Sequence, residues 1–273
     1  MAGRPVRGDR HFVGRDHELA AIAAACTDAD SGRGRLVVVR GAAGFGKTML
    51  CEQAAERAAQ SGFAVGWGRC WPDGGAPPLW PWPDILGDLG GPESVELLTG
   101  DPGRTRLDPD RFARFRAVGE FLADRASVSP LLVVIDDAHA ADTAALLLTR
   151  LLVRTLDRSR LVMLITRRSG ASESSPEQLR LLDEIEREAT TLDLRPFDHH
   201  EAAALLGAHG LHVEDYGLAP ALTRMTEGNP LLLTRAAVRA SHSRGSDGIE
   251  HVIGDALDVL TPEHRDVVAV AAL

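Results

Sequence analysis

The chain has 273 residues, of which 44% are hydrophobic and 25% charged, as in an ordinary globular protein of one large or two smaller domains. Its formal net charge of -9 argues against non-specific binding of nucleic acid. No apolar run approaches the roughly 20 residues of a membrane span, and the charged start lacks the apolar core of a signal peptide. We therefore expect a cytoplasmic protein without a membrane or nucleic-acid partner in these residues.

The cysteines, Cys26, Cys51 and Cys70, are widely spaced and form no C-x-x-C pair. This spacing supports neither a zinc site nor a disulfide framework. We expect all three to be buried apolar thiols.

The first predicted elements lie in residues 12–29, where the segment F-V-G-R leads into a helix. Asp16 is the expected N-cap of that helix, because aspartate accepts hydrogen bonds from the free N–H groups of a first turn.

A phosphate-binding loop is predicted next. Leu36–Val39 read as a buried strand, residues 41–48 (GAAGFGKT) have the spacing G-x-x-x-x-G-K-[ST], and Met49–Gln60 read as a helix. In this context the backbone N–H groups bind phosphate, Lys47 reaches the β- and γ-phosphates, and the Thr48 hydroxyl binds Mg²⁺. The alternative is a chance glycine-rich turn. The candidate cofactor-binding residues are Gly41, Ala43, Gly44, Phe45, Gly46, Lys47, Thr48 and Met49.

Lys47 is the single lysine of the chain, which otherwise uses arginine for positive charge. Proteins that select guanine often use an N-K-x-D box, and this chain has no second lysine to form one. The expected cofactors are therefore ATP and ADP with Mg²⁺.

All four tryptophans lie in residues 67–82, WGRCWPDGGAPPLWPW, together with several prolines that are expected to break any regular element. The stretch could be a lid or partner surface, or a hydrophobic plug over the edge of a sheet.

Two adjacent acids follow a buried strand in residues 131–142, LLVVIDDAHAAD. Asp136 is expected to hold the hydrated Mg²⁺, and Asp137 to accept a proton from an attacking water. Alternatively, Asp137 caps the helix from about Asp142 or is a solvated loop charge. His139 could orient Asp137 or a sensor loop, or have a structural role.

The remaining pattern predicts strands at Phe63–Gly68, at Leu161–Thr166, which Arg167 and Arg168 follow, and at Thr190–Leu194. It also predicts helices near 110–126, 142–156 and 176–188. Alternating strands and helices predict an α/β fold with a parallel sheet flanked by helices. From Pro196 onward the alternation stops. Short helices are expected at 198–207, 218–227 and 230–241, then a linker at 241–248 and a further helical pattern that Leu273 interrupts. We expect the natural protein to continue.

Six segments together resemble the nucleotide-binding region of STAND-type ATPases and, more narrowly, of the large ATP-binding regulators of the LuxR family in actinobacteria. The phosphate-loop motif alone is unspecific among P-loop proteins, whereas the set in this order is specific. The segments are FVGRDHEL (12–19), GAAGFGKT (41–48), GAPPLWPW (75–82), LLVVIDDAHAAD (131–142), LITRR (164–168) and TEGNPLLL (226–233).

The resemblance implies residue roles that the spacing of the motifs alone does not indicate. Val13, Gly14 and Arg15 would lie against adenine, Arg167, in preference to Arg168, would sense the γ-phosphate, and Gly228 and Pro230 would belong to a G-x-P motif that closes over the nucleotide. Without the resemblance, residues 228–230 read as an ordinary turn. The family usually has tryptophan where this chain has Ala140, which leaves the role of His139 in doubt.

The resemblance also implies an organisation. Residues 1–30 would be an N-terminal segment with a helix, 31–196 the P-loop domain, 197–245 the helical subdomain and 246–273 the start of a winged helix. In similar proteins DNA is bound by a C-terminal helix-turn-helix that these residues do not contain.

We expect an ATP-dependent regulatory switch that hydrolyses ATP slowly, self-associates on binding ATP and activates transcription, for example of a secondary-metabolite cluster. The catalytic residues would be Lys47, Asp137 and Arg167. The alternatives are an oligomeric ATPase motor or remodeller and a small-molecule kinase. Asp137 disfavours the kinase, because the nucleophile of a kinase is its substrate.

Overall fold

The structure, a computed structural model, describes residues 11–71, 77–98, 109–169, 174–211 and 218–242. By their contacts the described residues form two compact units. The α/β unit holds residues 16–40 and 50–192, and the helical unit holds residues 11–15, 41–49 and the described chain from Asp193 onward. The phosphate-loop residues thus group with the helical segment that follows the sheet.

The α/β unit is built on a parallel sheet that has five strands among the described residues, in the order β2-β3-β4-β1-β5. The carboxyl ends of β1, β3 and β4 share one edge, and Arg69 is the register partner of Asp136 there. This confirms the expected α/β fold, whereas the predicted winged helix lies outside the described residues. The strands are β1 (Arg35–Gly41), β2 (Ala64–Arg69), β3 (Leu131–Asp136), β4 (Leu161–Arg168) and β5 (Thr190–Asp193).

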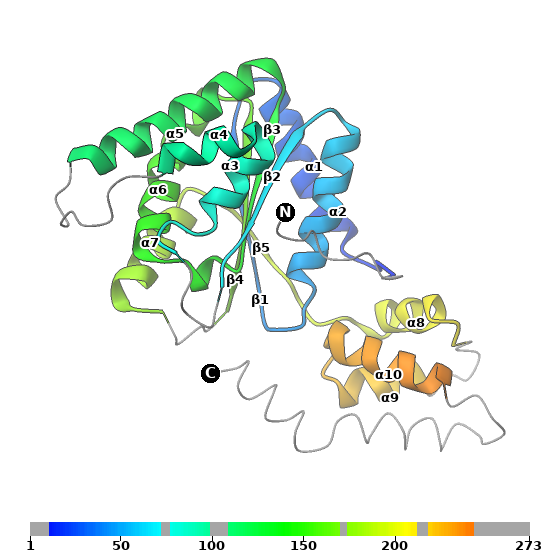
Figure 1. Cartoon of the computed structure of the whole chain (residues 1–273). Helices are drawn as coiled ribbons and strands as arrows, with labels where there is room; N and C mark the ends of the chain where they lie inside the picture. The colour runs from blue at the N-terminus through cyan, green and yellow to red at the C-terminus, as the bar shows by residue number, and fades with distance from the viewer. Residues whose placement is uncertain (1–10, 72–76, 99–108, 170–173, 212–217, 243–273) are drawn as a thin grey trace. The chain divides into compact units, whose positions relative to one another are not determined.

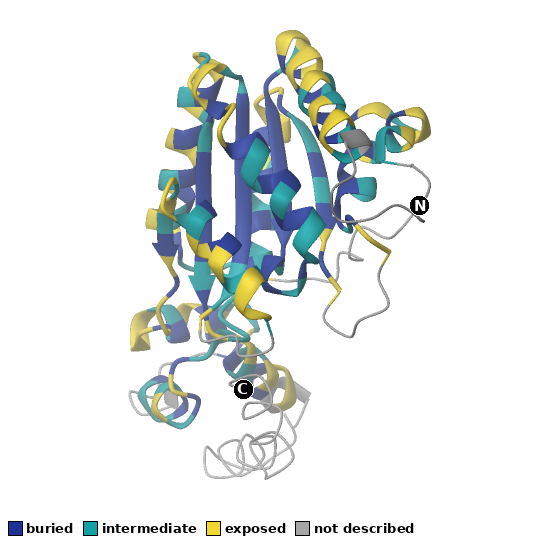
Figure 2. Cartoon of the chain, turned by 90° about the vertical axis from the view of Figure 1, so that its left-hand side faces the viewer, coloured by how far each residue is buried: buried dark blue, intermediate teal, exposed yellow. Residues whose placement is uncertain are grey.

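Helices cover both faces of the sheet, so its inner strands are buried on both sides. Leu131, Val133 and Ile135 of β3 pack in one cluster with α3, α5, α6 and α7, and the alternate residues of β3 face the other way. Figure 1 shows α1 and α2 on one side and α3, α5, α6 and α7 on the other, and Figure 2 shows the strands as the most buried elements. The helices of this unit are α1 (Asp16–Asp30), α2 (Lys47–Gln60), α3 (Trp82–Gly90), α4 (Pro92–Val95), α5 (Pro109–Val128), α6 (Thr143–Val153) and α7 (Pro176–Glu186), with 3₁₀ turns at Glu96–Leu98, Ala138–Ala140 and Leu156–Arg158.

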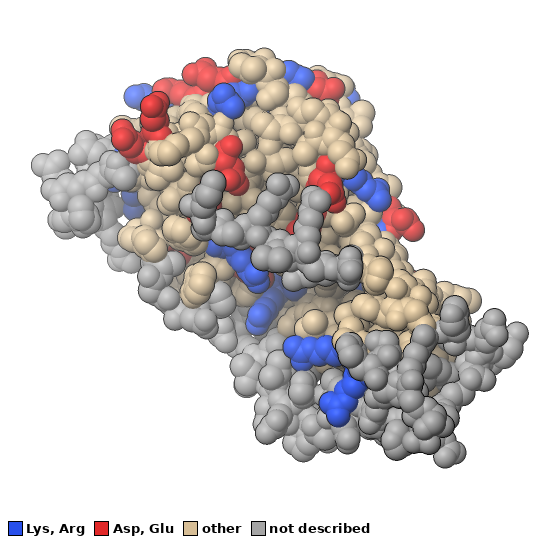
Figure 3. All heavy atoms as spheres, turned by 45° about the vertical axis from the view of Figure 1, so that its right-hand side comes forward, with Lys and Arg blue, Asp and Glu red and all other residues tan. Residues whose placement is uncertain are grey.

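Charged side chains of both signs are mixed on the face of the α/β unit that Figure 3 shows. Ion pairs of this unit include Arg33 with Asp28 at 2.7 Å and Arg160 with Asp30 at 2.6 Å. Within the described residues, no helix has both the length and the apolar character needed to cross a membrane.

Two details of the sequence prediction were wrong. Asp16 is the first residue of α1 and not the residue before it. Helix α3, which begins at Trp82, the last residue of the Trp/Pro stretch, was not predicted; Pro83 lies in its first turn, where the missing N–H costs nothing. Trp82 is fully buried whereas Trp71 is 59% exposed, so the tryptophans do not act as one plug.

The helical unit contains α8 (His199–Ala208), α9 (Leu218–Met225) and α10 (Pro230–His242), which confirms the three predicted helices. Asp198 starts α8 as a capping box with Glu201, whose side chain accepts from the backbone N–H of Asp198. The helices enclose a small core of their own that includes Leu205, Leu222 and Leu233. Of the predicted linker, the start lies in α10 and the rest, with the later helical pattern, falls outside the described residues.

Candidate functional site

The phosphate loop leaves β1 at Gly41 and enters α2 at Lys47. The side chain of Lys47 is buried, and its Nζ donates to the carbonyl oxygens of Gly41 and Ala42, at 2.9 Å each. Gly44 and Gly46 have φ values of 80° and 86°, a left-handed conformation that favours glycine. The sequence pattern therefore produces the expected loop, with its cation folded against the loop backbone.

Two groups near the start of α10 hold this loop. The Asn229 Nδ2 donates to the carbonyl of Ala43 at 3.1 Å, and the backbone N–H of Leu231 donates to that of Gly44 at 3.2 Å. A Cβ at position 44 would lie 2.6 Å from the Asn229 Oδ1. Position 44 therefore requires glycine both for the close approach of Asn229 and for the positive φ of its backbone. The helical subdomain therefore contacts the loop backbone directly.

The V-G-R segment also belongs to this unit. Val13 packs against the core of the helical subdomain. Arg15 is buried, and its Nη2 donates to the carbonyls of Arg195 at 2.6 Å and Phe45 at 3.4 Å. Its guanidinium lies 4.9 Å from the ring centroid of Phe197. The proposed contact of this segment with adenine stays a prediction, while its contact with the phosphate loop is a feature of the structure.

Residues 228–230 form a tight turn. Gly228 has φ of 68°, donates to the carbonyl of Thr223 at 2.8 Å, and accepts from the N–H of Phe197 at 2.8 Å. A Cβ at position 228 would lie 2.3 Å from the carbonyl oxygen of Phe197, which excludes other residues without a backbone shift. Pro230 is the first residue of α10, where its fixed φ suits a helix start.

The two acids lie at the end of β3 in the α/β unit. Asp136 is fully buried, and its Oδ1 accepts from the hydroxyl of Thr166, the buried residue near the end of β4, at 2.7 Å. The same hydroxyl oxygen accepts from the backbone N–H of Asp137 at 2.8 Å. Thr166 therefore fixes the first acid through its side chain and the second through its backbone.

Asp137 has φ of 58°, a left-handed conformation that aspartate tolerates better than most residues. Its Oδ2 accepts from Nη2 of Arg69 at 3.2 Å, and the Arg69 Nε lies 3.7 Å from Oδ2 of Asp136. The alternative role of Asp137 as a helix cap was wrong, because Asp142 caps α6 by accepting from the N–H groups of Ala144 and Ala145. The carboxylate of Asp137 instead faces a cation from the neighbouring strand.

Arg167 is anchored to α7. Its Nη1 donates to Oε2 of Glu186 at 2.8 Å and to Oδ1 of Asp183 at 3.2 Å, and Arg40 pairs with the other Glu186 oxygen at 3.2 Å. The sensor role of Arg167 stays a prediction. A nucleotide that draws this guanidinium to its phosphate would have to compete with two carboxylates.

The cysteines are free, and Cys51 and Cys70 are buried as expected, whereas Cys26 is only partly buried. Burial raises the pKa of the Cys70 thiol, and the carboxylates of Asp137 and Asp136 raise it further. Burial also raises the pKa of Cys26 to about 11. Both thiols are therefore protonated at neutral pH and poor nucleophiles.

Sequence reasoning missed three residues that contact the candidate residues, namely Arg69 and Thr166 in the α/β unit and Asn229 in the helical unit. Arg69 directly follows the strand predicted at Phe63–Gly68, so a charged residue at the carboxyl end of a strand was the signal available. Thr166 was noted as the end of a strand and Asn229 as the middle of a turn. Their hydrogen bonds join residues distant in sequence, which periodicity does not reveal.

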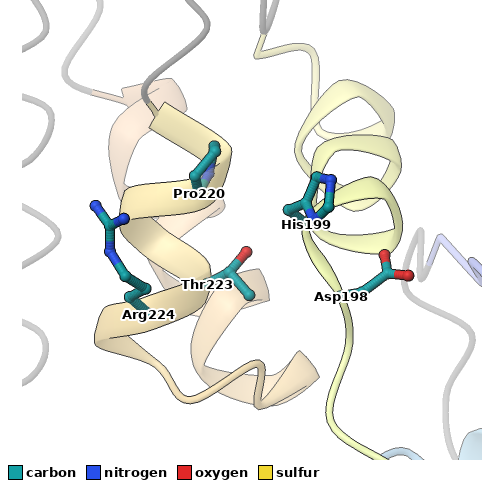
Figure 4. Close-up of a pocket in the computed structure, with 5 residues that line it drawn as sticks. All are labelled: Asp198, His199, Pro220, Thr223 and Arg224. Atoms are coloured by element: carbon teal, nitrogen blue, oxygen red, sulfur yellow. The ribbon is translucent and has the colours of Figure 1, made fainter.

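A surface hollow of about 440 Å³ lies in the helical unit between α8 and α9. The charged side chains that line it either form hydrogen bonds elsewhere or point away from α8. The Asp198 carboxylate caps α8, and Arg224 points away from α8 in Figure 4. We assign this hollow no role in nucleotide chemistry. It is lined by Asp198, His199, Pro220, Thr223 and Arg224.

The sequence profile described as an AAA ATPase domain matches residues 11–165, more than half of the chain. No curated protein sequence matches the chain.

Solved structures share the fold. The ORC2 protein of Aeropyrum pernix, in ADPNP–ADP complexes, is 18% identical with a TM-score of 0.57, over 93% of this chain and 71% of that one. Domain III of the replication initiation protein DnaA from Thermotoga maritima is 16% identical with a TM-score of 0.52, over 92% and 95%. A STAND protein with a tetratricopeptide repeat sensor from Pyrococcus horikoshii is 18% identical with a TM-score of 0.51, over 98% of this chain but 36% of that one. At these identities the likeness establishes the fold.

Proposed function

The chain belongs to the family of AAA ATPase domains, and on this premise we propose that it is a regulatory switch that binds ATP and ADP with Mg²⁺ and hydrolyses ATP slowly. One observation carries the slow hydrolysis. The candidate base, Asp137, sits beside buried Asp136 with its carboxylate already paired to Arg69. Asp137 can act as a base in this position, but the Arg69 guanidinium must first move away, and this requirement slows hydrolysis.

The phosphate loop supplies the binding groups. Backbone N–H groups of a glycine loop before a helix bind phosphate oxygens, and the dipole of α2 favours negative charge there. The Lys47 Nζ would exchange the carbonyls of Gly41 and Ala42 for phosphate oxygens. This exchange replaces two neutral acceptors by charged ones, which bind an ammonium group more strongly.

The donor chemistry of two residues fits Mg²⁺. Mg²⁺ prefers oxygen ligands and keeps several waters, and Asp136 offers a carboxylate and Thr48 a hydroxyl. The Thr166 hydroxyl donates to Oδ1 of Asp136, and Oδ2, which lies 3.7 Å from the Arg69 Nε, is the oxygen that we propose for the hydrated cation. When bound, Mg²⁺ would neutralise charge on the phosphates.

Asp137 would accept the proton of the attacking water. General-base assistance contributes typically about 10²- to 10⁴-fold to a rate, provided that the base is free to accept a proton. The ion pair with Arg69 occupies one of the two carboxylate oxygens. Movement of Arg69 would therefore accompany each turnover, which suits a switch better than a rapid ATPase.

More specifically, we propose that the natural protein is an ATP-binding regulator of the LuxR family. The six segments named above support it, as does the fold of a STAND protein of which this chain spans 36%. In this assignment residues 31–196 form the nucleotide-binding domain, 197–245 the helical subdomain and 246–273 the start of a winged helix, in a cytoplasmic protein that self-associates on ATP. A helix-turn-helix elsewhere in the natural protein would bind DNA, for example at a secondary-metabolite cluster.

Binding of ATP and ADP in the presence of Mg²⁺, measured by calorimetry, tests the proposal. We expect both nucleotides to bind and Lys47→Ala to bind neither. Arg57→Ala, which removes an exposed cation from the same helix, should bind like the wild type. Wild-type affinity in the Lys47→Ala variant, or no binding by the wild type, would rule the proposal out.

A further inference from the structure

The carbonyl oxygens of the phosphate loop are held by hydrogen bonds at five consecutive residues. The Lys47 Nζ takes the first two, at 2.9 Å each. The other three are taken by donors from outside the loop. Asn229 donates to Ala43 at 3.1 Å, Leu231 to Gly44 at 3.2 Å and Arg15 to Phe45 at 3.4 Å.

The direction of a carbonyl sets the direction of the next amide. Because the peptide unit is planar and trans, the C=O of one residue and the N–H of the next point in opposite directions. Holding the carbonyl of Ala43 therefore directs the N–H of Gly44 to the opposite side, and holding that of Phe45 directs the N–H of Gly46. Neither glycine has a side chain to restrict its own backbone, so without these bonds both amides would sample many directions.

We propose that Asn229 is a positioning residue for phosphate binding, which orients the Gly44 amide through the Ala43 carbonyl. The inference rests on the proposed function, since it concerns the same loop. It adds a residue from the helical subdomain, in the middle of the G-x-P turn, that acts on the loop itself. Leu231 and Arg15 donate to the next two carbonyls, those of Gly44 and Phe45.

The carboxamide of Asn229 makes two kinds of hydrogen bond at once, one as an acceptor and one as a donor. No other common helix-cap side chain can make both at these distances. The Asn229 Oδ1 accepts from the N–H of Leu231 at 3.0 Å and thereby caps α10. Its Nδ2 donates to the loop. A serine would keep the cap, but its single short hydroxyl would not also reach Ala43. The substitution Asn229→Ser therefore separates the effects of the two hydrogen bonds.

The positioning role links nucleotide binding to docking of the subdomain. If a ligand binds more tightly when the loop carbonyls are hydrogen-bonded to the subdomain, it must also favour the docked subdomain. Ligand binding and docking are then thermodynamically linked by one coupling free energy. Release of Asn229 from Ala43 would weaken phosphate binding even with every loop residue intact.

The test compares Asn229→Ser with Asp198→Ser, which exchanges the cap of α8 in the same unit without touching the loop. Calorimetry measures the affinities for ATP and for inorganic pyrophosphate, which carries no base. We expect Asn229→Ser to weaken both by about three- to tenfold, as for the loss of one hydrogen bond. Asp198→Ser should bind both like the wild type. Unchanged affinities in Asn229→Ser, or an equal loss in Asp198→Ser, would overturn the proposal.

Amide hydrogen exchange of residues 41–46 without nucleotide gives a second readout. We expect faster exchange in Asn229→Ser than in the wild type and Asp198→Ser, and equal exchange would contradict the positioning role. The two proposals fail differently. Absence of ATP binding by the wild type would remove the proposed function and this inference with it. Tight binding by both the wild type and Asn229→Ser would remove only the inference.

Discussion

Arg69, at the end of β2, donates from Nη2 to Oδ2 of Asp137 at 3.2 Å, and its Nε lies 3.7 Å from Oδ2 of Asp136. One guanidinium thus faces both acids of the candidate catalytic site. Its side chain is 61% exposed, whereas Asp136 is fully buried and Asp137 is 14% exposed. The arrangement places an exposed guanidinium over one buried and one nearly buried carboxylate.

Removal of this cation should speed hydrolysis. We expect Arg69→Ala to raise the steady-state rate of ATP hydrolysis by about two- to fivefold, because water around the exposed guanidinium screens the pair and limits it to roughly 0.2–1 kcal/mol. The affinity for ATP should change little. Arg33→Ala, which removes an exposed arginine paired with Asp28 in the same unit, serves as the control. A slower Arg69→Ala enzyme would show that the guanidinium promotes the reaction.

The second acid should be needed for hydrolysis and not for binding. Asn has the shape of Asp and also tolerates the left-handed backbone at position 137, so Asp137→Asn keeps the fold and removes the base. We expect hydrolysis to fall by about 10²- to 10⁴-fold with nucleotide affinity retained. Phosphate release and calorimetry measure the two quantities. If Asp137→Asn hydrolysed ATP at the wild-type rate, the assigned role of Asp137 would be incorrect.

The turn at Gly228 should tolerate no side chain. A Cβ would lie 2.3 Å from the Phe197 carbonyl at a φ of 68°, so we expect Gly228→Ala to destabilise the helical unit by about 1–3 kcal/mol. Gly207→Ala is the matched control, because nothing lies within 4 Å of its Cβ position in α8. There alanine should be neutral or stabilising, since it favours a helix. Thermal unfolding distinguishes the two, and equal melting temperatures would contradict the turn geometry.

Acid should weaken the helical unit through His209. Burial lowers the pKa of His209 from its ordinary 6.5, and the charge of His11, whose ring lies 5.0 Å away, lowers it further. The folded state then binds fewer protons than the unfolded chain, so the free energy of unfolding falls as the pH drops from 6.5 toward the lower folded pKa. Denaturant unfolding across this window should show a smaller loss in His209→Gln. An equal loss in both proteins would contradict the assignment.

The sequence predicted well the features that depend on neighbouring residues. The loop around Lys47 and the buried strand before Asp136 carry their pattern within a few positions, and both lie where expected. The helix at Trp82–Gly90 was missed because the prolines before it suggest irregular chain, although Pro83 fits a first helical turn.

The rest of the site depends on residues far apart in the chain. Arg69 is separated from Asp137 by 68 positions, and Asn229 from Ala43 by 186. No period or local motif indicates such pairs, since they arise from the register of parallel strands and from the docking of α10 on the loop. The resemblance singled out Gly228 and Pro230 on either side of Asn229, but the turn geometry was needed to assign the carboxamide.

The fate of bound ATP in a single turnover tests the central claim most directly. Protein in excess over labelled ATP would be followed for cleavage and, in parallel, for release of ADP. We predict cleavage with ADP retained, because a switch keeps its product until another event resets it. Rapid release of ADP followed by repeated turnover far above about 1 s⁻¹ without a partner, within the ordinary range of enzymes, would contradict the switch and favour a working ATPase.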